Sequence, residues 1–284
     1  MELCCDEELV SIETSVYLPL DDAALDLADD WYTTMLHQER LRVAFNPSFH
    51  YVQTRRVLVD WTCDVGDALH LEKWIVHTAV MYLDRLLSEG EKPLQTELQL
   101  YCLCSLFIAA KTFALDSDIP SLHDMHAYAN GLYSTHDIMR YEGRLLQALR
   151  WSLTAMHPLS FVRFYVASAP LFPDDTIHHL RLGDPSENAE LLDRYSALVE
   201  SLADLCLSEY AFLEYLPSIV ATAILAVGRR ILNITPIWRN EMEALTGYAV
   251  HDMEACYHHV YRQYEMQSQK PGLAETSPAA VSDL

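Results

Sequence analysis

Hydrophobic residues recur at three- and four-residue steps along most of this chain, which is the spacing of an amphipathic helix. Leu27, Trp31 and Met35 mark the first such stripe, and Asn46-Pro47 ends it. The predicted helices of the first half cover residues 23–45, 55–71, 74–87, 98–115, 121–132 and 135–150.

The helical pattern restarts after Pro158, with a loop rich in Pro and Gly after its first helix. Segments 98–115 and 215–232 are apolar almost all round, so each must be surrounded by other helices. The predicted helices of the second half cover residues 159–169, 188–207 and 215–232, followed by two more that end near Met266.

The two halves resemble a repeat, because segment 133–138 (Y-S-T-H-D-I) is echoed by segment 248–253 (Y-A-V-H-D-M). Two helical bundles, each wrapped around a central helix, are the expected all-α architecture. We expect a poorly ordered N-terminus (1–22), a first domain with its preceding helix (23–156), a second domain (157–266) and a disordered tail (267–284).

The composition agrees with this architecture and excludes several classes of function. Only 8 Gly and 12 Pro occur in 284 residues, too few for the frequent turns of an all-β protein. The net charge of −22 opposes binding to nucleic acid and to anionic membranes. The acidic N-terminus does not resemble a signal peptide, and the apolar stretch 216–228 is too short to span a bilayer.

The seven cysteines are odd in number and include no C-x-x-C, which favours reduced thiols. The expected location is therefore the nucleus, the cytoplasm or both. Cys102 and Cys104 lie two apart on a predicted helix, so they face different directions and favour core packing over a shared metal.

The sequence contains no glycine-rich phosphate loop, no H-E-x-x-H and no G-x-S-x-G, so we expect no catalytic residues, cofactor or metal. Four charged residues stand beside apolar helix faces: Arg55, Asp84, Lys111 and Glu142. Such charges are either paired or covered by a partner, or else they extend to water along their aliphatic stems. A binding role is the default.

These charged positions lie in segments that resemble the cyclin family. Segment 54–61 (T-R-R-V-L-V-D-W) resembles its M-R-x-I-L-V-D-W signature, and segment 82–87 (Y-L-D-R-L-L) resembles Y-I-D-R-F-L. Segment 108–111 (I-A-A-K) resembles L-A-S-K. Segments 215–218 and 246–248 resemble the C-terminal box of cyclins A and B, and the whole resemblance covers residues 28–266.

The resemblance implies two five-helix cyclin boxes preceded by an N-terminal helix. Members of the family are not enzymes; they bind a cyclin-dependent Ser/Thr kinase and activate it. Arg55 and Asp84 match an ion pair inside the first box. The residues that match the family's kinase contacts are Lys111 and Glu142, with apolar neighbours Ile108, Leu146, Trp151, Leu153 and Trp31.

The family also has a groove that docks substrates or inhibitors carrying R-x-L motifs. The matching residues here are Val57, Leu58, Trp61, Asp64, Gln95 and Gln99. Thr54 stands where a Met is usual and Gln95 where an Arg is usual, so we expect weaker docking than in typical members. Gln99 has a second interpretation, a capping box with Thr96 at the start of a helix.

The sequence departs from the family at segment 112–115 (T-F-A-L), where an acidic F-E-E is usual, so the choice of kinase stays open. One alternative is a protein with cyclin boxes that binds a different partner, such as transcription machinery. Another is a helical scaffold unrelated to cyclins, which the four charged positions disfavour.

Overall fold

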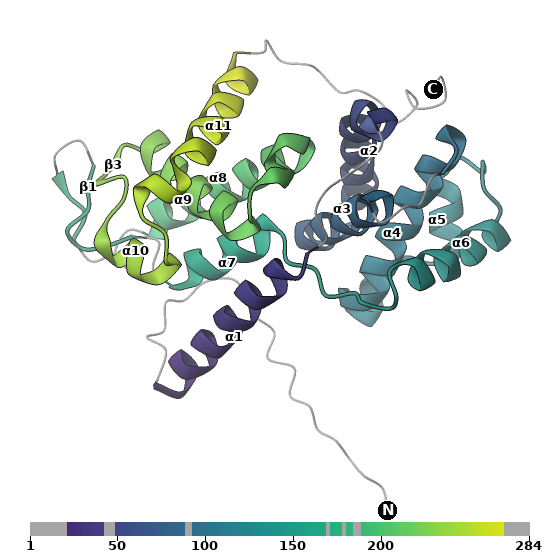
Figure 1. The fold of residues 1–284 in the computed structure, drawn as a ribbon, viewed down its shortest axis with the longest axis horizontal. Coiled ribbons are helices and arrows are strands. Elements are labelled where there is room, and N and C mark those ends of the chain that lie inside the picture. The colour runs from purple at the N-terminus through teal and green to yellow at the C-terminus, as the bar shows by residue number, and fades with distance from the viewer. Residues whose placement is uncertain are drawn as a thin grey trace, which may run out of the picture.

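The structure, a computed structural model, describes residues 22–42, 49–88, 93–168, 171–177, 180–183 and 189–269. Eleven α-helices occur among these residues, and most of them form two domains that lie side by side (Figure 1). The first domain comprises α2 (Phe49–Ala68), α3 (Lys73–Ser88), α4 (Leu98–Phe113), α5 (Leu122–Tyr128) and α6 (Thr135–Ala148). The second comprises α7 (Pro158–Ser168), α8 (Ala189–Ser208), α9 (Pro217–Ile231), α10 (Asn240–Thr246) and α11 (Val250–Ser268).

Each domain is built around one helix that is apolar on all sides, as the sequence predicts. In the first domain α4 packs against α2, α3 and α6, and in the second α9 packs against α7, α8 and α11. Burying such a helix on every face removes most of its apolar surface from water, which stabilises the bundle. Cys102 and Cys104 are buried in α4, in agreement with their predicted core role.

Several predicted segment ends differ from the structure. Helix α1, for example, ends at Arg40 rather than at residue 45. Helix α2 begins at Phe49 rather than at Arg55, because Tyr51 belongs to the core and its hydroxyl donates to Asp84 at 2.7 Å. Helix α11 continues to Ser268, so the tail does not begin at residue 267. The disorder expected for 1–21 and 270–284 concerns residues outside those that the structure describes.

Helix starts in the first domain use reciprocal side-chain caps. At α6 the Ser134 hydroxyl accepts from the Asp137 amide at 3.1 Å, and the Asp137 carboxylate accepts from the Ser134 amide at 3.3 Å. The capping box expected for Thr96 and Gln99 before α4 is wrong. A short 3-10 turn, η1 (Gln95–Glu97), precedes α4 instead, and the Glu97 carboxylate accepts from the Leu94 amide at 2.8 Å.

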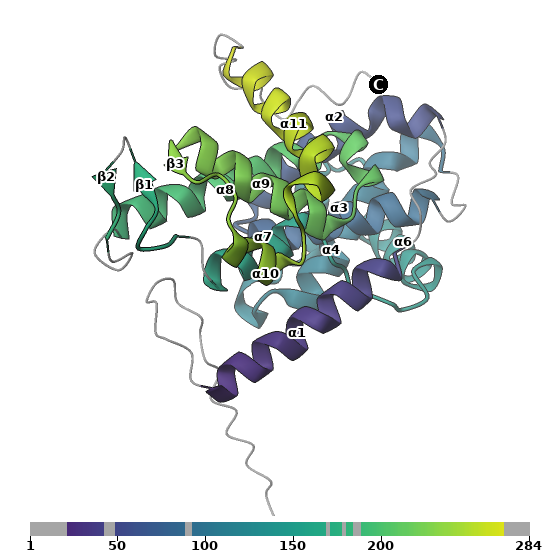
Figure 2. The same cartoon turned by 60° about the vertical axis from the view of Figure 1, so that its left-hand side comes forward.

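Helix α1 (Asp22–Arg40) precedes the first domain in the chain but packs against the second (Figure 2). Met35 is buried in the second core, and the Tyr32 hydroxyl donates to the Thr246 carbonyl at 2.8 Å. The buried Glu39 carboxylate accepts from the Ser218 amide at 3.0 Å and from its hydroxyl at 2.7 Å. Because Ser218 lies in the first turn of α9, this carboxylate satisfies an amide that has no partner within the helix.

The segment after α7, predicted as a loop, contributes two strands to a small antiparallel sheet. The strands β1 (Thr176–Ile177), β2 (Leu180–Arg181) and β3 (Ile234–Thr235) have the order β2-β1-β3. Each has two residues, which is too short for an alternating pattern to be recognised in a sequence. Among the described residues, no helix combines the length and apolar character that crossing a bilayer requires.

Candidate partner-binding surface

Lys111 and Glu142 form an ion pair at the surface of the first domain. The Lys111 ammonium, in the last turn of α4, lies 2.7 Å from a Glu142 carboxylate oxygen on α6. It also lies 3.9 Å from the centre of the Phe107 ring, one turn earlier on α4. Lys111 is exposed and Glu142 is partly buried, so the pair is reachable from outside the molecule.

The turn that follows α6, the helix of Glu142, carries an exposed tryptophan on a strained backbone. Trp151 is 68 % exposed, and its amide donates to the Leu146 carbonyl at 3.0 Å where α6 ends. Arg150 and Trp151 both have positive φ, 54° and 56°, a conformation that glycine usually supplies at helix ends. Bulky residues there cost about 1–3 kcal/mol each, and strain of this kind clusters at functional sites.

The other residues expected around the pair differ in exposure. Leu146 and Leu153 are half-buried and pack against the first core, each with part of its side chain in water. Trp31 is 57 % exposed on α1. Ile108 is only 2 % exposed, which corrects the expectation that its side chain offers an apolar contact to a partner.

Two exposed apolar residues near the pair were missed in the sequence. Met139 is one turn before Glu142 on α6, and Leu115 follows the end of α4. For Met139 the available signal was its helical spacing of three residues from Glu142. Leu115 lies beyond α4 in extended backbone, so helical spacing did not indicate it. Exposed apolar side chains around a partly buried charge are typical of the centre of a protein interface.

Arg55 and Asp84 are buried and pair with each other inside the first domain. Arg55 Nε and Nη2 donate to the two Asp84 oxygens at 2.7 and 2.8 Å. Its third nitrogen, Nη1, donates to the Leu207 carbonyl at the end of α8 at 2.9 Å. Burial disfavours the charged guanidinium, but the Asp84 carboxylate outweighs this and the pKa of Arg55 is raised. The pair therefore also ties the first domain to the second.

The residues expected in the docking groove do not form one exposed face. Val57 is 43 % exposed, whereas Leu58 and Trp61 are buried in the first core. Val57 follows Thr54 by three residues along α2, and the partly buried Thr54 hydroxyl donates to the Tyr51 carbonyl at 3.2 Å. Leu58 and Trp61 each expose only 5 % of their surface, so α2 presents mainly Val57 to a peptide.

The polar residues expected in the groove lie at the surface. Asp64 is exposed on α2, Gln95 is exposed on η1 and Gln99 is half-buried at the start of α4. Partial burial, together with the charges of Asp60 and Asp67, raises the pKa of Asp64. These three carboxylates on α2 concentrate negative charge that would attract a basic peptide.

The described residues hold no group of three or more His, Cys, Asp or Glu side chains that could bind a metal ion. The five described cysteines are free thiols, four of them buried. Burial raises the pKa of Cys102 to about 12, which keeps this thiol protonated and unreactive at neutral pH.

Comparison with protein families covers both domains. The sequence matches the family model described as "Cyclin, N-terminal domain" over residues 30–154 and the model "Cyclin, C-terminal domain" over residues 156–275. Cyclin-A3-2 of Oryza sativa subsp. japonica is 30% identical over 71% of this chain and 48% of its own length. Cyclin-B1-2 of Arabidopsis thaliana is 27% identical over 90% of this chain and 57% of its own. The chain thus spans about half the length of these relatives.

Solved structures share the fold at lower identity. A viral cyclin from herpesvirus saimiri superposes with a TM-score of 0.64 and 16% identity, over 82% of this chain and 96% of that one. A chain of the CAK complex of Chaetomium thermophilum, bound to ATP-gamma-S, has a TM-score of 0.55 and 16% identity, over 88% of this chain and 79% of that one. Both carry the arrangement of two helical domains described above.

Proposed function

This chain belongs to the cyclin family, and from that premise we propose that it binds and activates a cyclin-dependent Ser/Thr protein kinase. The observation that carries the proposal is the exposed Lys111–Glu142 pair, together with Trp151, which is exposed on the turn that ends the helix of Glu142. Hydrogen bonds to charged groups, surrounded by apolar contacts that exclude water, are the contacts that dominate interface energies.

The proposed mechanism is allosteric. A kinase is active when the lysine of its β3 strand pairs with the glutamate of its αC helix, and the position of αC controls this pairing. A rigid surface that binds only the active arrangement shifts the kinase population toward it. The central helix α4 and its neighbour α6 supply such a rigid surface, and this chain contributes no catalytic group.

Lys111 and Glu142 bond each other in the free chain, and both side chains can make further hydrogen bonds to a partner. An ammonium has three donors and a carboxylate about four acceptor positions, so each side chain can keep the other while it also bonds a partner. The pair is therefore preorganised, which lowers the ordering cost of association.

Recovery of bound kinase from cells tests the proposal directly. The tagged chain should retain a Ser/Thr kinase whose activity toward a peptide substrate rises when more chain is added. Recovery of a non-kinase partner together with no kinase would contradict the proposal and favour the alternative, a cyclin-fold protein of different purpose. We propose that the chain acts in the nucleus, the cytoplasm or both, and the cellular location of the recovered kinase would distinguish these compartments.

We also propose that α2 and the start of α4 dock R-x-L peptides weakly. The support is the exposed Val57 together with the negative charge of Asp60, Asp64 and Asp67. Replacing Asp64 with Lys should weaken an R-x-L peptide, and Thr54→Met should tighten it by enlarging the apolar contact. A peptide affinity that is unchanged from the wild type in both variants would show that this surface is not a docking site.

A further inference from the structure

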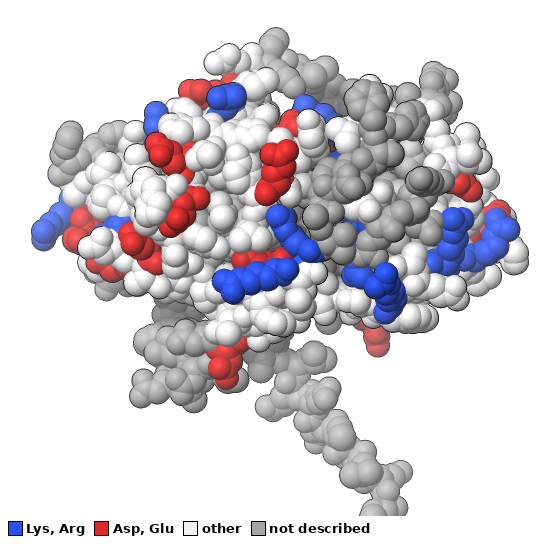
Figure 3. Space-filling model, in the orientation of Figure 1, with Lys and Arg blue, Asp and Glu red and all other residues white. Residues whose placement is uncertain are grey.

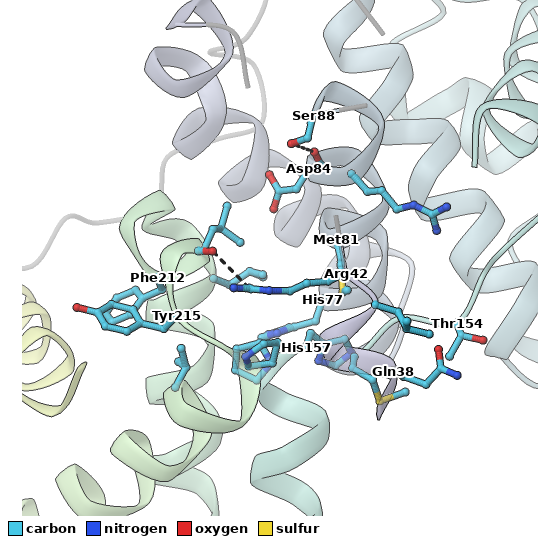
Figure 4. A pocket seen from close by; sticks show the side chains of 18 of the residues that line it. Gln38, Arg42, His77, Met81, Asp84, Ser88, Thr154, His157, Phe212 and Tyr215 are labelled. Carbon is cyan, nitrogen blue, oxygen red and sulfur yellow. Dashed lines mark hydrogen bonds between the residues drawn. The ribbon is translucent and has the colours of Figure 1, made fainter. Parts of the chain in front are cut away.

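A pocket lies at the junction of α1, α3, the connector between the two domains and the start of α9 (Figure 4). Its volume is about 230 Å³. A dry cavity of roughly 150 Å³ suffices to bind benzene, so this pocket has room for a compact ligand with one ring. The apolar part of its wall comes from Met81, Met156, Phe212, Leu213 and Val220.

The polar part of the wall carries an excess of positive charge. Arg42, Arg55 and Arg85 line the pocket, against the carboxylate of Asp84. The Arg85 guanidinium donates to the Ser152 and Leu149 carbonyls at 2.7 and 3.0 Å. Because Arg55 and Asp84 neutralise each other in their bidentate pair, the excess comes from Arg42 and Arg85. In a chain of net charge −22 this is unusual, and Figure 3 shows Lys and Arg side chains near the middle of the molecule, where the domains meet.

Two histidines, His77 and His157, also line the pocket. His157 is buried, and desolvation followed by the nearby His77 lowers its pKa well below 6.5, so it is neutral at physiological pH. The His77 imidazole lies 2.9 Å from the Asp204 carboxylate on α8. His157 therefore adds no positive charge to the pocket wall at physiological pH.

Arg42 is the cation best placed to meet a ligand. Its Nη1 donates to the Leu213 carbonyl at 3.3 Å across the pocket (Figure 4), and its side chain is half-buried. Burial lowers the pKa of Arg42, and the nearest carboxylate that opposes this, Glu39, is held by Ser218. A carbonyl carries only a partial charge, so an anion at Arg42 would compensate the guanidinium better than its present acceptor does.

We propose that this pocket between the domains binds a small carboxylate with a compact apolar body. The carboxylate bonds Arg42, and the ring or branched body packs against Met81 and Leu213. Such a ligand touches α1, the first domain and the second domain together, so its binding stabilises their mutual arrangement. The site lies apart from the Lys111–Glu142 surface and goes beyond the proposed kinase activation.

Benzoate is a suitable probe, with benzamide as a neutral molecule of the same shape. Titration of the full chain, followed by ligand-observed NMR and by thermal unfolding, should show saturable benzoate binding that raises the melting temperature. Benzamide should bind more weakly by roughly tenfold or more, the expected loss for one hydrogen bond to a charged group. Equal binding of the two molecules, or no binding of benzoate, would overturn the proposal.

Three variants locate the binding within the molecule. Arg42→Met should weaken benzoate by about tenfold or more while Arg42→Lys keeps part of the affinity, because the charge remains. Arg194→Met, at an exposed position of α8 outside the pocket, should leave affinity unchanged. Met81→Trp should exclude benzoate by filling the pocket from the partly buried side of α3. Unchanged affinity in Arg42→Met or Met81→Trp would place the benzoate elsewhere and refute the proposed site.

Discussion

The central helix of each domain ends in a cation that meets the last helix of that domain, but with different partners. In the first domain Lys111 of α4 meets the Glu142 carboxylate on α6 at 2.7 Å. In the second, Arg230 of α9 meets the Tyr257 hydroxyl on α11 at 3.1 Å and stacks over the Tyr261 ring. The first contact joins opposite charges beside the Phe107 ring, whereas the second joins a cation to a tyrosine hydroxyl and an aromatic ring.

The aromatic residues around these two contacts also differ in their exposure. In the first domain, Trp151 is exposed on the turn after α6, where its backbone has positive φ. Beside Arg230, the Tyr257 and Tyr261 rings stack 6.5 Å apart and are half-buried. An internal stack satisfies its cation without a partner, so the comparison favours the first domain as the site of the proposed kinase contact.

The domains agree in a different feature, a buried pair of arginine and aspartate. Arg55 pairs with Asp84 in the first domain, and Arg229 pairs with Asp175 in the second. Arg229 and Asp175 are fully buried, and Arg229 also donates to the Pro236 carbonyl. The sequence indicated the first pair by its resemblance, while the second pair depends on a loop whose path only the structure supplies.

The largest expected effect tests this agreement between the domains. Arg55→Ala should destabilise the protein by about 3–5 kcal/mol, because it leaves the buried Asp84 carboxylate without its cation. Arg229→Ala should also destabilise it by more than an exposed pair would, although Asp175 keeps Arg239 as a cationic partner at 2.9 Å. Denaturant melts followed by circular dichroism would measure both. Arg163→Ala, which removes an exposed pair with Glu200, is the control and should cost below about 1 kcal/mol. A cost in that small range for Arg55 or Arg229 would contradict the buried pairing.

The next effect tests the difference between the domains. Exchanging the charges with Lys111→Glu and Glu142→Lys should abolish kinase recovery while the helical fold persists, a loss of about 2–5 kcal/mol in binding. The same exchange at Arg163 and Glu200, also an exposed pair between helices, should leave recovery unchanged. If kinase binding survives the first exchange, or is lost in Arg230→Glu, the assignment to the first domain is wrong.

The junction between the domains should respond to pH through His157. Its folded pKa lies well below 6.5, so the unfolded chain binds more protons as pH falls below that value. Stability from this group is therefore fully present above about pH 6.5 and is lost toward acid, by at most about 1.4 kcal/mol per pH unit. Urea melts of the wild type and His157→Gln between pH 7.5 and about 5 should differ in slope. Parallel slopes would show that His157 titrates normally.

The smallest effect compares glycines within helices. A methyl group at Gly143 of α6 meets nothing within 4 Å, so Gly143→Ala should stabilise by about 0.5–1 kcal/mol. At Gly228 of α9 the same group lies 2.7 Å from a Val199 methyl and 3.1 Å from the Tyr195 ring, so Gly228→Ala should cost about 1–3 kcal/mol. Thermal melts of the two variants should move in opposite directions, and a shared direction would contradict the packing around Gly228.

Local signals explain which parts of the candidate surface were predictable. Lys111 and Glu142 stand beside apolar residues at helical spacing, so their closeness to the surface could be inferred. Ile108 stands at a similar spacing, yet it is buried, because α4 is enclosed on the side that faces the core. The burial of Leu58 and Trp61 could not be predicted for the same reason: periodicity identifies a helix face but not the neighbour that covers it.

The sequence by itself determined the all-α class, the two central helices and most helix positions, because these follow from hydrophobic spacing within single segments. Tertiary structure alone decided that α1 packs on the second domain, where Glu39 meets Ser218, 179 positions along the chain. It also decided the small sheet, the Arg229–Asp175 pair and the pocket at Arg42. Each of these depends on contacts between segments that are distant in the sequence, and a local pattern does not indicate which distant segments meet.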